Sequence, residues 1–392
     1  MILEDMILDN VKNMPPSGIR KYFDMINEME DVISLGVGEP DFVTPWNVRE
    51  AGIYSLEKGH THYSSNAGFM ELRYEISKYL KRRFNLSYKP ENEILVTVGG
   101  SEGIDIALRA LVGPGDEVVV PEPSFVAYKG CTAFTGATSR VINLKEENQF
   151  KLTAEELEEA ITEKTKVVII PFPNNPTGAI MTREELEPIV KVLKDKNVIV
   201  ISDEIYAELS YGSDHVSIAS FPEIKDKTLV INGFSKAYAM TGWRLGYVCG
   251  NPVLIEAMKK IHQYAIMCSP TTAQYAAIEA LKHSESDVNT MVKEYNRRRR
   301  VLVDGFRRIG LSCFEPLGAF YVFPCITSTG LTSDEFCEKL LMEEKVLVVP
   351  GNAFGECGEG FIRACYASSM DNIVEALKRM ERFVSKHKNI DK

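Results

Sequence analysis

Short apolar runs of strand length alternate with longer segments of helical period between residues 93 and 249. The apolar runs are EILVTV, EVVV, KVVII, NVIVIS, TLVIN and LGYVC, and the first three precede the helical segments SEGIDIALRALV, SFVAYKGCTAF and REELEPIVKVLK. This alternation is typical of a mostly parallel sheet wrapped by helices. We therefore predict an α/β fold whose large domain covers residues 45–285.

The pattern changes after residue 285, where a long charged helical stretch is followed by short strand-like runs. These runs are CFEP, AFYVF, KVLVV and GFIRACYA, and helices are predicted over residues 332–344 and 370–385. Short strands mixed with separate helices predict a small α+β domain over residues 286–392.

The long charged stretch contains a basic run at residues 297–300. Four consecutive arginines are compatible with an anion-binding site, but the apolar residues Val301, Leu302 and Phe306 continue a helical period past them. We therefore interpret the run as a solvated face of a helix.

Composition limits the class of protein and excludes several kinds of partner. The chain has 392 residues, 45% hydrophobic and 26% charged, which is ordinary for a globular protein of two domains. Its net charge of −10 argues against nucleic-acid or anionic-membrane partners. The first residues, MILEDMILDN, lack a basic start, and no run of about 18 apolar residues occurs. We expect a cytoplasmic protein without a membrane segment, in which local arginines attract a small anionic substrate.

The eight cysteines are scattered along the chain and form no CxxC pair. This spacing indicates neither a zinc site nor a redox pair, so we expect no metal and reduced, structural thiols. The positions are Cys131, Cys249, Cys268, Cys313, Cys325, Cys337, Cys357 and Cys365.

The segment GFSKAYAMTGWRLGY, residues 233–247, holds a lysine among small and hydroxylic side chains. A lysine captures a carbonyl group when burial or a nearby cation lowers its pKa, and Arg244 is the candidate cation for Lys236. A guanidinium also suits a phosphate, so Ser235, Lys236 and Arg244 together predict a site for a phosphorylated aldehyde cofactor. Pyridoxal 5'-phosphate fits that description.

Two further motifs come where buried strands are predicted to end. NNPTG closes the apolar run KVVIIPF, and ISDEIY closes the run NVIV. Ligands bind at that edge in open α/β sheets. Asp203 is placed to pair with a pyridinium nitrogen, which lets the ring act as an electron sink. Tyr206 and Asn175 are candidates to hydrogen-bond the ring's phenolic oxygen.

The segment GGSEG, starting at Gly99, follows a predicted strand and opens a helix. Backbone N–H groups at such a helix start, together with the positive end of the helix dipole, favour an anion. Alone, this motif indicates only a tight turn. In this series of motifs we expect Gly100, Ser101 and Glu102 to bind the cofactor's phosphate.

At these residues the chain resembles the class I and II aminotransferases, which are fold-type I pyridoxal-phosphate enzymes. The likeness also covers SGIRKYFDM, ISLGVGEPDFVTP, HYSSNAGFMELR, VTVGGSEGID, GAFYVFP and VPGNAF, which occur in the family's order and extend nearly from end to end. Within the family the chain is most similar to the branch that contains the Bacillus-type N-acetyl-diaminopimelate aminotransferase and the aspartate aminotransferases of bacteria and archaea.

The resemblance implies roles for residues that spacing alone leaves unassigned. Phe125 corresponds to the aromatic residue that stacks on the cofactor ring; the alternative is a core position. Tyr63 corresponds to a tyrosine that reaches the phosphate of the neighbouring subunit, which implies a homodimer with shared active sites; the alternative is packing in its own core. Residues 1–44 would pack with the small domain, and Ile19 belongs to a segment that covers the active site as it closes.

Recognition of the substrate's α-carboxylate requires a cation, preferably a planar one. Arg363 is our candidate, because an arginine in the apolar run GFIRACYA must be paired with something. A structural ion pair is the alternative. The backbone N–H of Gly38 and the side chain of Asn175 would complete this clamp.

These residues predict a pyridoxal-phosphate-dependent aminotransferase with ping-pong kinetics, in which Lys236 holds the cofactor and then moves the substrate's α-proton. An L-amino acid leaves as a keto acid before a second 2-oxo acid accepts the amino group. One alternative is a C–S β-lyase of the cystathionine type, since fold does not fix function. A cofactor-binding regulator is a weaker alternative, because the chain has no residues to spare for a DNA-binding domain.

The amino donor is the least determined feature. A dicarboxylate donor needs a second cation, and Ser101 occupies a position where some aspartate-active relatives have a lysine. Similarity to the branch above makes N-acetyl-diaminopimelate the first candidate, followed closely by aspartate and aromatic amino acids. The aromatic residues expected near the site are Tyr63, Phe125, Tyr206 and Phe354.

Overall fold

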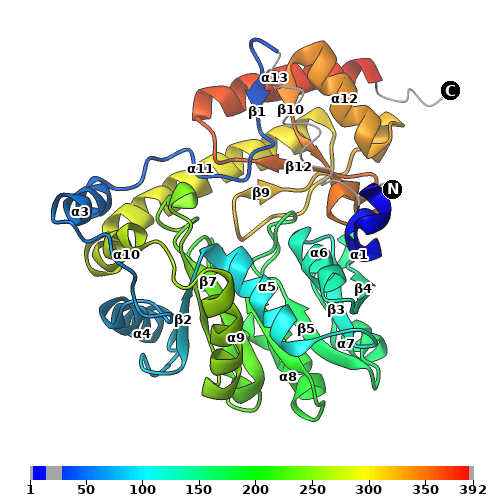
Figure 1. The fold of residues 1–392 in the computed structure, drawn as a ribbon. Coiled ribbons are helices and arrows are strands. Elements are labelled where there is room, and N and C mark those ends of the chain that lie inside the picture. Colours follow the sequence, from blue (N-terminus) through cyan, green and yellow to red (C-terminus); the bar gives the residue numbers. More distant parts are fainter. Residues whose placement is uncertain (1–2, 15–28, 388–392) are drawn as a thin grey trace.

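The computed structural model describes residues 3–14 and 29–387, and its centre is a seven-stranded sheet (Figure 1). The strand order is β2-β8-β7-β6-β5-β3-β4. Neighbours from β7 to β4 are parallel, and β8 is antiparallel to both β7 and β2. The predicted mostly parallel sheet is therefore confirmed. The strands are β2 (Ile94–Thr97), β3 (Glu117–Glu122), β4 (Thr138–Asn143), β5 (Thr165–Ile170), β6 (Ile199–Asp203), β7 (Thr228–Gly233) and β8 (Gly246–Cys249).

The central strands are buried on both faces, which explains why their sequences are continuous apolar runs. In β5, Val167 and Ile169 belong to one apolar cluster, whereas Val168 and Ile170 belong to another. Successive side chains of a strand point to opposite faces, so the two clusters lie on the two sides of the sheet. Parallel strands covered by helices on both sides have this composition.

Helices cover the sheet and connect its strands (Figure 1). Two of them, α7 and α8, begin with capping boxes, in which a threonine and a glutamate satisfy each other's backbone N–H groups. The helices of this part are α3 (Trp46–Glu57), α4 (Met70–Phe84), α5 (Gly99–Leu111), α6 (Ala127–Phe134), α7 (Ala154–Ala160), α8 (Arg183–Lys194), α9 (Pro252–Ala265) and α10 (Thr271–His283).

A second group of elements lies above the carboxyl ends of the parallel strands in Figure 1. Strand β1, from the N-terminal part of the chain, pairs in parallel with β10, and β11, β12 and β9 form an antiparallel sheet. These elements are β1 (Ile33–Ser34), α11 (Glu285–Ile309), β9 (Tyr321–Val322), α12 (Ser333–Glu344), β10 (Val346–Leu347), β11 (Val349–Pro350), β12 (Ile362–Cys365) and α13 (Met370–His387).

Short helices complete the described chain. The first α-helix, α1 (Asp9–Lys12), lies beside α6, where the amide of Asn10 donates to the carbonyl of Ala133. None of the described helices is long and apolar enough to cross a membrane. The 3-10 helices are η1 (Leu3–Met6), η2 (Glu146–Asn148), η3 (Ile218–Ser220), η4 (Lys225–Lys227), η5 (Thr241–Trp243), η6 (Thr327–Thr329), η7 (Gly351–Phe354) and η8 (Glu356–Gly358).

The predicted strand CFEP, residues 313–316, is wrong, because this segment has no regular structure. Backbone carbonyl groups of this segment accept hydrogen bonds from side chains of α11: Arg307 donates to Cys313 O and Arg299 donates to Pro316 O. The run KVLVV also differs from the prediction, since it divides into β10 and β11, which pair with different partners.

The interpretation of the basic run as a solvated helix face is wrong for its two central arginines. Arg298 and Arg299 are buried, while the two outer arginines are exposed. Arg298 donates to both carboxylate oxygens of Asp41 at 2.8 Å and to Glu294 at 2.9 Å. Arg299 pairs with Glu315. The run therefore ties α11 to neighbouring loops through ion pairs.

Candidate active site

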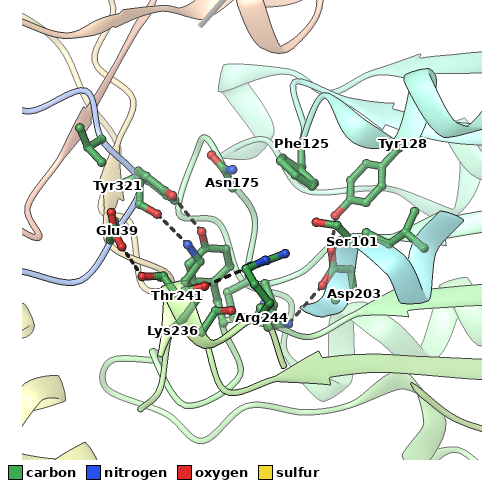
Figure 2. Close-up of a pocket in the computed structure, with 18 of the residues that line it drawn as sticks. Glu39, Ser101, Phe125, Tyr128, Asn175, Asp203, Lys236, Thr241, Arg244 and Tyr321 are labelled. Atoms are coloured by element: carbon green, nitrogen blue, oxygen red, sulfur yellow. Dashed lines mark hydrogen bonds between the residues drawn. The ribbon is translucent and has the colours of Figure 1, made fainter. Parts of the chain in front are cut away.

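A cavity of about 480 Å³ lies at the carboxyl ends of β5, β6 and β7 (Figure 2). Each strand delivers one predicted residue to it: Asn175 follows β5, Asp203 ends β6 and Lys236 follows β7. The cavity brings together most of the predicted site residues, which are Gly38, Gly100, Ser101, Phe125, Asn175, Asp203, Tyr206, Ser235, Lys236, Arg244 and Arg363.

The amine of Lys236 donates a hydrogen bond of 2.6 Å to the carbonyl of Gly38. The pKa of this amine is lowered to about 8, mainly by burial, with smaller contributions from the cations Arg363 and Arg244 and opposing ones from Cys365 and Glu39. The sequence predicted burial or a nearby cation as the cause, with Arg244 as the candidate cation. In the structure burial is the main cause and Arg244 makes a smaller contribution. A buried amine of this kind is a candidate nucleophile and base.

Asp203 is a buried carboxylate at the end of β6. Its Oδ2 accepts a hydrogen bond of 2.7 Å from the hydroxyl of Tyr128, and its Oδ1 accepts one of 3.2 Å from the backbone N–H of Ile205 (Figure 2). Burial raises the pKa of Asp203 to about 6, although both hydrogen bonds act in the opposite direction. Asp203 therefore presents a carboxylate whose burial would be compensated by a cationic ligand group.

Tyr128 and Tyr321 line the cavity and were missed by sequence reasoning. Tyr128 lies three positions after Phe125 in the segment SFVAY, and the two rings meet edge to face with centroids 5.7 Å apart. Tyr321 belongs to the motif GAFYVF, which supported the family resemblance without a role for this residue. Its hydroxyl lies 2.8 Å from that of Tyr206.

The start of α5 forms one wall of the cavity and is shaped for an anion. Gly99 has a left-handed backbone, with φ of +75°, and a Cβ there would lie 2.7 Å from Nη2 of Arg244. Gly100 and Ser101 of the first turn line the cavity. Arg244 donates to the carbonyl of Thr241 at 3.1 Å and has no carboxylate within 4 Å among the described residues. A helix start beside an unpaired guanidinium fits a phosphate.

The side chain of Glu102 turns away from this wall. Its Oε2 accepts the backbone N–H of Val98 at 2.5 Å, and its Oε1 lies 2.6 Å from Nδ1 of the buried His262 on α9. Glu102 does not line the cavity. Its side chain therefore holds the turn that precedes α5, and only its backbone N–H remains available for the predicted role.

Arg363 on β12 is buried and faces the cavity with 3% of its surface exposed. It donates to Asn175 Oδ1 at 2.9 Å and to the carbonyl of Gly36 at 2.6 Å, and its Nε is buried without a partner. The guanidinium lies 4.5 Å from the ring of Tyr321 and 4.7 Å from that of Phe354. In the described part of the chain no carboxylate pairs with it, so the structural ion pair is not observed. A buried cation without a carboxylate partner favours an anionic ligand.

Of the remaining predicted residues, one lies apart from this cavity and one falls outside the described part of the chain. Tyr63 is 77% exposed in the loop between α3 and α4 and does not line the cavity, so it does not pack in its own core. Ile19 lies outside the described residues. The eight cysteines are free thiols, and among the described side chains no group of three or more metal-binding residues converges.

Comparison with known proteins assigns the family. Residues 30–380 match the family model for aminotransferases of class I and II, so the chain belongs to this family and is an enzyme. It is 54% identical to the putative aminotransferase YugH of Bacillus subtilis (strain 168) over 378 residues, which are 96% of this chain and 98% of the relative. It is 44% identical to an aspartate aminotransferase of Pyrococcus abyssi, over 97% of this chain and 98% of that one.

A solved structure of the same family has the same fold. The crystal structure of an aromatic aminotransferase from Pyrococcus horikoshii OT3 matches with a TM-score of 0.89 and 42% identity, and the match covers 94% of this chain and 99% of that one. The family resemblance read from the motifs is therefore confirmed, and so is the α/β fold class.

Proposed function

We propose that the protein transfers an amino group from an L-amino acid to a 2-oxo acid with pyridoxal 5'-phosphate as its cofactor. One observation carries the proposal: a single cavity joins the buried amine of Lys236, the buried carboxylate of Asp203 and the guanidinium of Arg363, with which no carboxylate of the described residues pairs. These three groups suit a carbonyl carbon, a ring nitrogen and a carboxylate, in that order.

The remaining lining residues fit the other parts of the cofactor. Gly100, Ser101, Ser235 and Arg244 would hold the phosphate, because they supply a helix start, hydroxyl groups and a free cation. Phe125 offers a ring face for stacking. When bound, the cofactor supplies an electron sink for the charge that forms at the substrate's α-carbon.

Asp203, Asn175 and Tyr206 set the orientation of the ring in this proposal. Asp203 would pair with the ring nitrogen, and the hydroxyl of Tyr206 and the amide of Asn175 would donate to the phenolic oxygen. All three side chains line the cavity from strand ends of the same sheet, which limits their movement. Lys236 approaches from the strand beside β6, so its amine is held near the reacting carbon.

Lys236 is the proton carrier of the reaction. Since burial lowers its pKa to about 8, a useful fraction of the amine is neutral near neutral pH and can accept the α-proton. The carbonyl of Gly38 orients the amine at 2.6 Å. Arg363, Asn175 and the backbone N–H of Gly38 would bind the carboxylate that donor and acceptor share, so one clamp serves both halves of a ping-pong reaction.

Three classes of donor are candidates: N-acetyl-diaminopimelate, aspartate and aromatic amino acids. Identity to an aspartate aminotransferase supports aspartate. The cations lining the described cavity are Lys236, Arg244 and Arg363, and each already has a role. A distal carboxylate would therefore need a cation from outside the described lining. This observation favours an uncharged side chain, and hence an aromatic amino acid among the three.

We include in the proposal a cytoplasmic homodimer with shared active sites, without nucleic-acid or membrane partners. The exposure of Tyr63 supports the dimer, because an exposed loop tyrosine is free to reach a neighbouring subunit. The net charge of −10 supports the absence of nucleic-acid and anionic-membrane partners. No feature of the described residues favours the carbon–sulfur lyase.

The test is a half-reaction with the cofactor-loaded enzyme and single amino acids, without a 2-oxo acid. Absorbance follows conversion of the cofactor to its amino form, and the panel contains phenylalanine, aspartate, cystathionine and N-acetyl-diaminopimelate. Stoichiometric conversion with release of the matching 2-oxo acid is expected for the true donor. Continuous breakdown of cystathionine to pyruvate and a thiol, with no amino form of the cofactor, would replace transamination by the lyase reaction.

A further inference from the structure

Tyr321 touches three parts of the candidate site that come from distant parts of the sequence. Its hydroxyl lies 2.8 Å from the hydroxyl of Tyr206, in the turn that follows β6. The same hydroxyl fills the space beside Gly38, where a Cβ would collide with it. The guanidinium of Arg363 lies 4.5 Å from the centre of its ring. Tyr321 is 1% exposed, so these contacts fix its position firmly.

The hydrogen bond between the two phenols has a direction that matters for the reaction. Among the described residues, each hydroxyl is the only hydrogen-bond partner of the other, and either oxygen can be the donor. Burial raises the pKa of Tyr321 and of Tyr206, so both hydroxyls keep their protons near neutral pH. If Tyr206 donated to Tyr321, it would have no proton left for a ligand in the cavity.

We propose that Tyr321 is a positioning residue whose hydroxyl donates to Tyr206, so that the hydrogen of Tyr206 points into the cavity and meets the phenolic oxygen of the cofactor. This inference rests on the proposed function. A phenol that accepts a hydrogen bond becomes a stronger donor, because the two bonds polarise each other. Tyr321 would thus act on the cofactor through Tyr206.

The contacts of Tyr321 also connect this hydrogen bond to substrate binding. Tyr321 sits on β9, which pairs with β12, and β12 carries the carboxylate-binding Arg363. Its ring lies under the guanidinium that would hold the α-carboxylate, while its hydroxyl faces Tyr206. The small sheet therefore presents the carboxylate clamp and the phenol that orients Tyr206 as one rigid unit.

The experiment compares Tyr321→Phe, Tyr206→Phe and the double variant in the cofactor-loaded enzyme. The readout is the pH midpoint of the cofactor's absorbance change, together with kcat and KM. Tyr211→Phe is the matched control, because Tyr211 is equally buried and donates to the carbonyl of Ala319, away from the cavity. Tyr366 donates to the same carbonyl, so the control leaves no buried acceptor without a partner.

A hydroxyl that donates to the phenolic oxygen stabilises negative charge there, so removing it raises the pH midpoint. Tyr206→Phe should therefore raise the pH midpoint. Tyr321→Phe should raise the pH midpoint by about half to one pH unit and lower kcat about two- to tenfold. In the Tyr206→Phe background, Tyr321→Phe should add no further shift, and the control should leave the midpoint unchanged.

Two results would overturn the inference. A midpoint that Tyr321→Phe leaves unchanged, or one that shifts equally with and without Tyr206, would show that Tyr321 does not act through Tyr206. Failure of the proposed function has a different signature. The protein would then bind no pyridoxal phosphate, and borohydride would attach none to Lys236.

Discussion

The hydroxyl of Tyr128 donates a hydrogen bond of 2.7 Å to Asp203, and this bond keeps a buried carboxylate partly ionised. Burial raises the pKa of Asp203 to about 6, while the bond from Tyr128 is the largest effect in the opposite direction. The proposed pairing of Asp203 with a cationic ring nitrogen would therefore depend on a residue of α6 as well as on its own strand.

Tyr128→Phe should raise the pKa of Asp203 further and weaken cofactor binding at neutral pH about three- to tenfold, the usual range for one buried hydrogen bond. Equilibrium titration of the cofactor-free protein with pyridoxal phosphate measures the affinity. Tyr211→Phe is again the control. Equal affinities of the Tyr128→Phe variant and the unmodified protein across pH 5–8 would contradict this prediction.

Asp203→Asn tests how much the burial of this carboxylate lowers the free energy of unfolding of the cofactor-free protein. The folded pKa of about 6 lies above the ordinary value of 3.8, so between these pH values the folded state holds a proton that the unfolded chain has lost. The free energy of unfolding therefore falls as pH rises through this window, by at most about 3 kcal/mol.

The Asn variant should lose this slope, so the Tm of the cofactor-free variant should exceed that of the unmodified protein at pH 8 and approach it at pH 4. Its transamination should fall by at least about a hundredfold, because a neutral amide does not pair with a cationic ring nitrogen. Parallel Tm curves over this range would show that Asp203 does not control the pH dependence.

Lys236→Ala should retain the cofactor without a covalent bond and show negligible transamination. Ser101 and Arg244, which we propose bind the phosphate, are unchanged in this variant, so affinity should fall less than activity. Borohydride should attach the cofactor to the unmodified protein and not to the variant, as mass spectrometry of the intact chain would reveal. Near-normal turnover by Lys236→Ala would remove the basis of the proposed function.

Arg363→Lys should weaken binding of both amino donor and 2-oxo acid, because a lysine cannot reproduce the planar donor pair of a guanidinium. The loss of one charge-assisted hydrogen bond predicts a fall in kcat/KM of about ten- to a hundredfold for both substrates. Cofactor affinity should stay unchanged. Arg382→Lys, at an exposed arginine paired with Glu344, is the control. A fall for one substrate alone would contradict a shared carboxylate clamp.

The parts of the site that could be predicted are those encoded by local patterns. The buried strands are recognisable in the sequence as apolar runs. Polar residues at or just after the ends of these runs, such as Asp203 and Lys236, are therefore expected at the edge of the sheet where ligands bind. The start of α5 was predictable for the same reason, since Gly99 and Gly100 follow a strand and open a helix.

The parts that were missed depend on contacts between distant segments. Tyr321 reaches Tyr206 across 115 positions, and Tyr128 reaches Asp203 across 75. Arg298 looked solvated because its partner Asp41 is 257 positions away. Helical periodicity describes one element at a time, so it cannot show which other element will cover a given face.

The pairing of β1 with β10 joins Ile33 to Val346, which the ribosome adds 346 − 33 = 313 residues later. At about 5–20 residues per second, roughly 15–60 s pass between the synthesis of β1 and that of its partner strand. The carbonyl of Gly38, which receives the amine of Lys236, lies just beyond β1. The strands of the large sheet end at Cys249, so they are all synthesised before β10 and β12. The large sheet can therefore form before Gly38 and Arg363 are brought to the cavity.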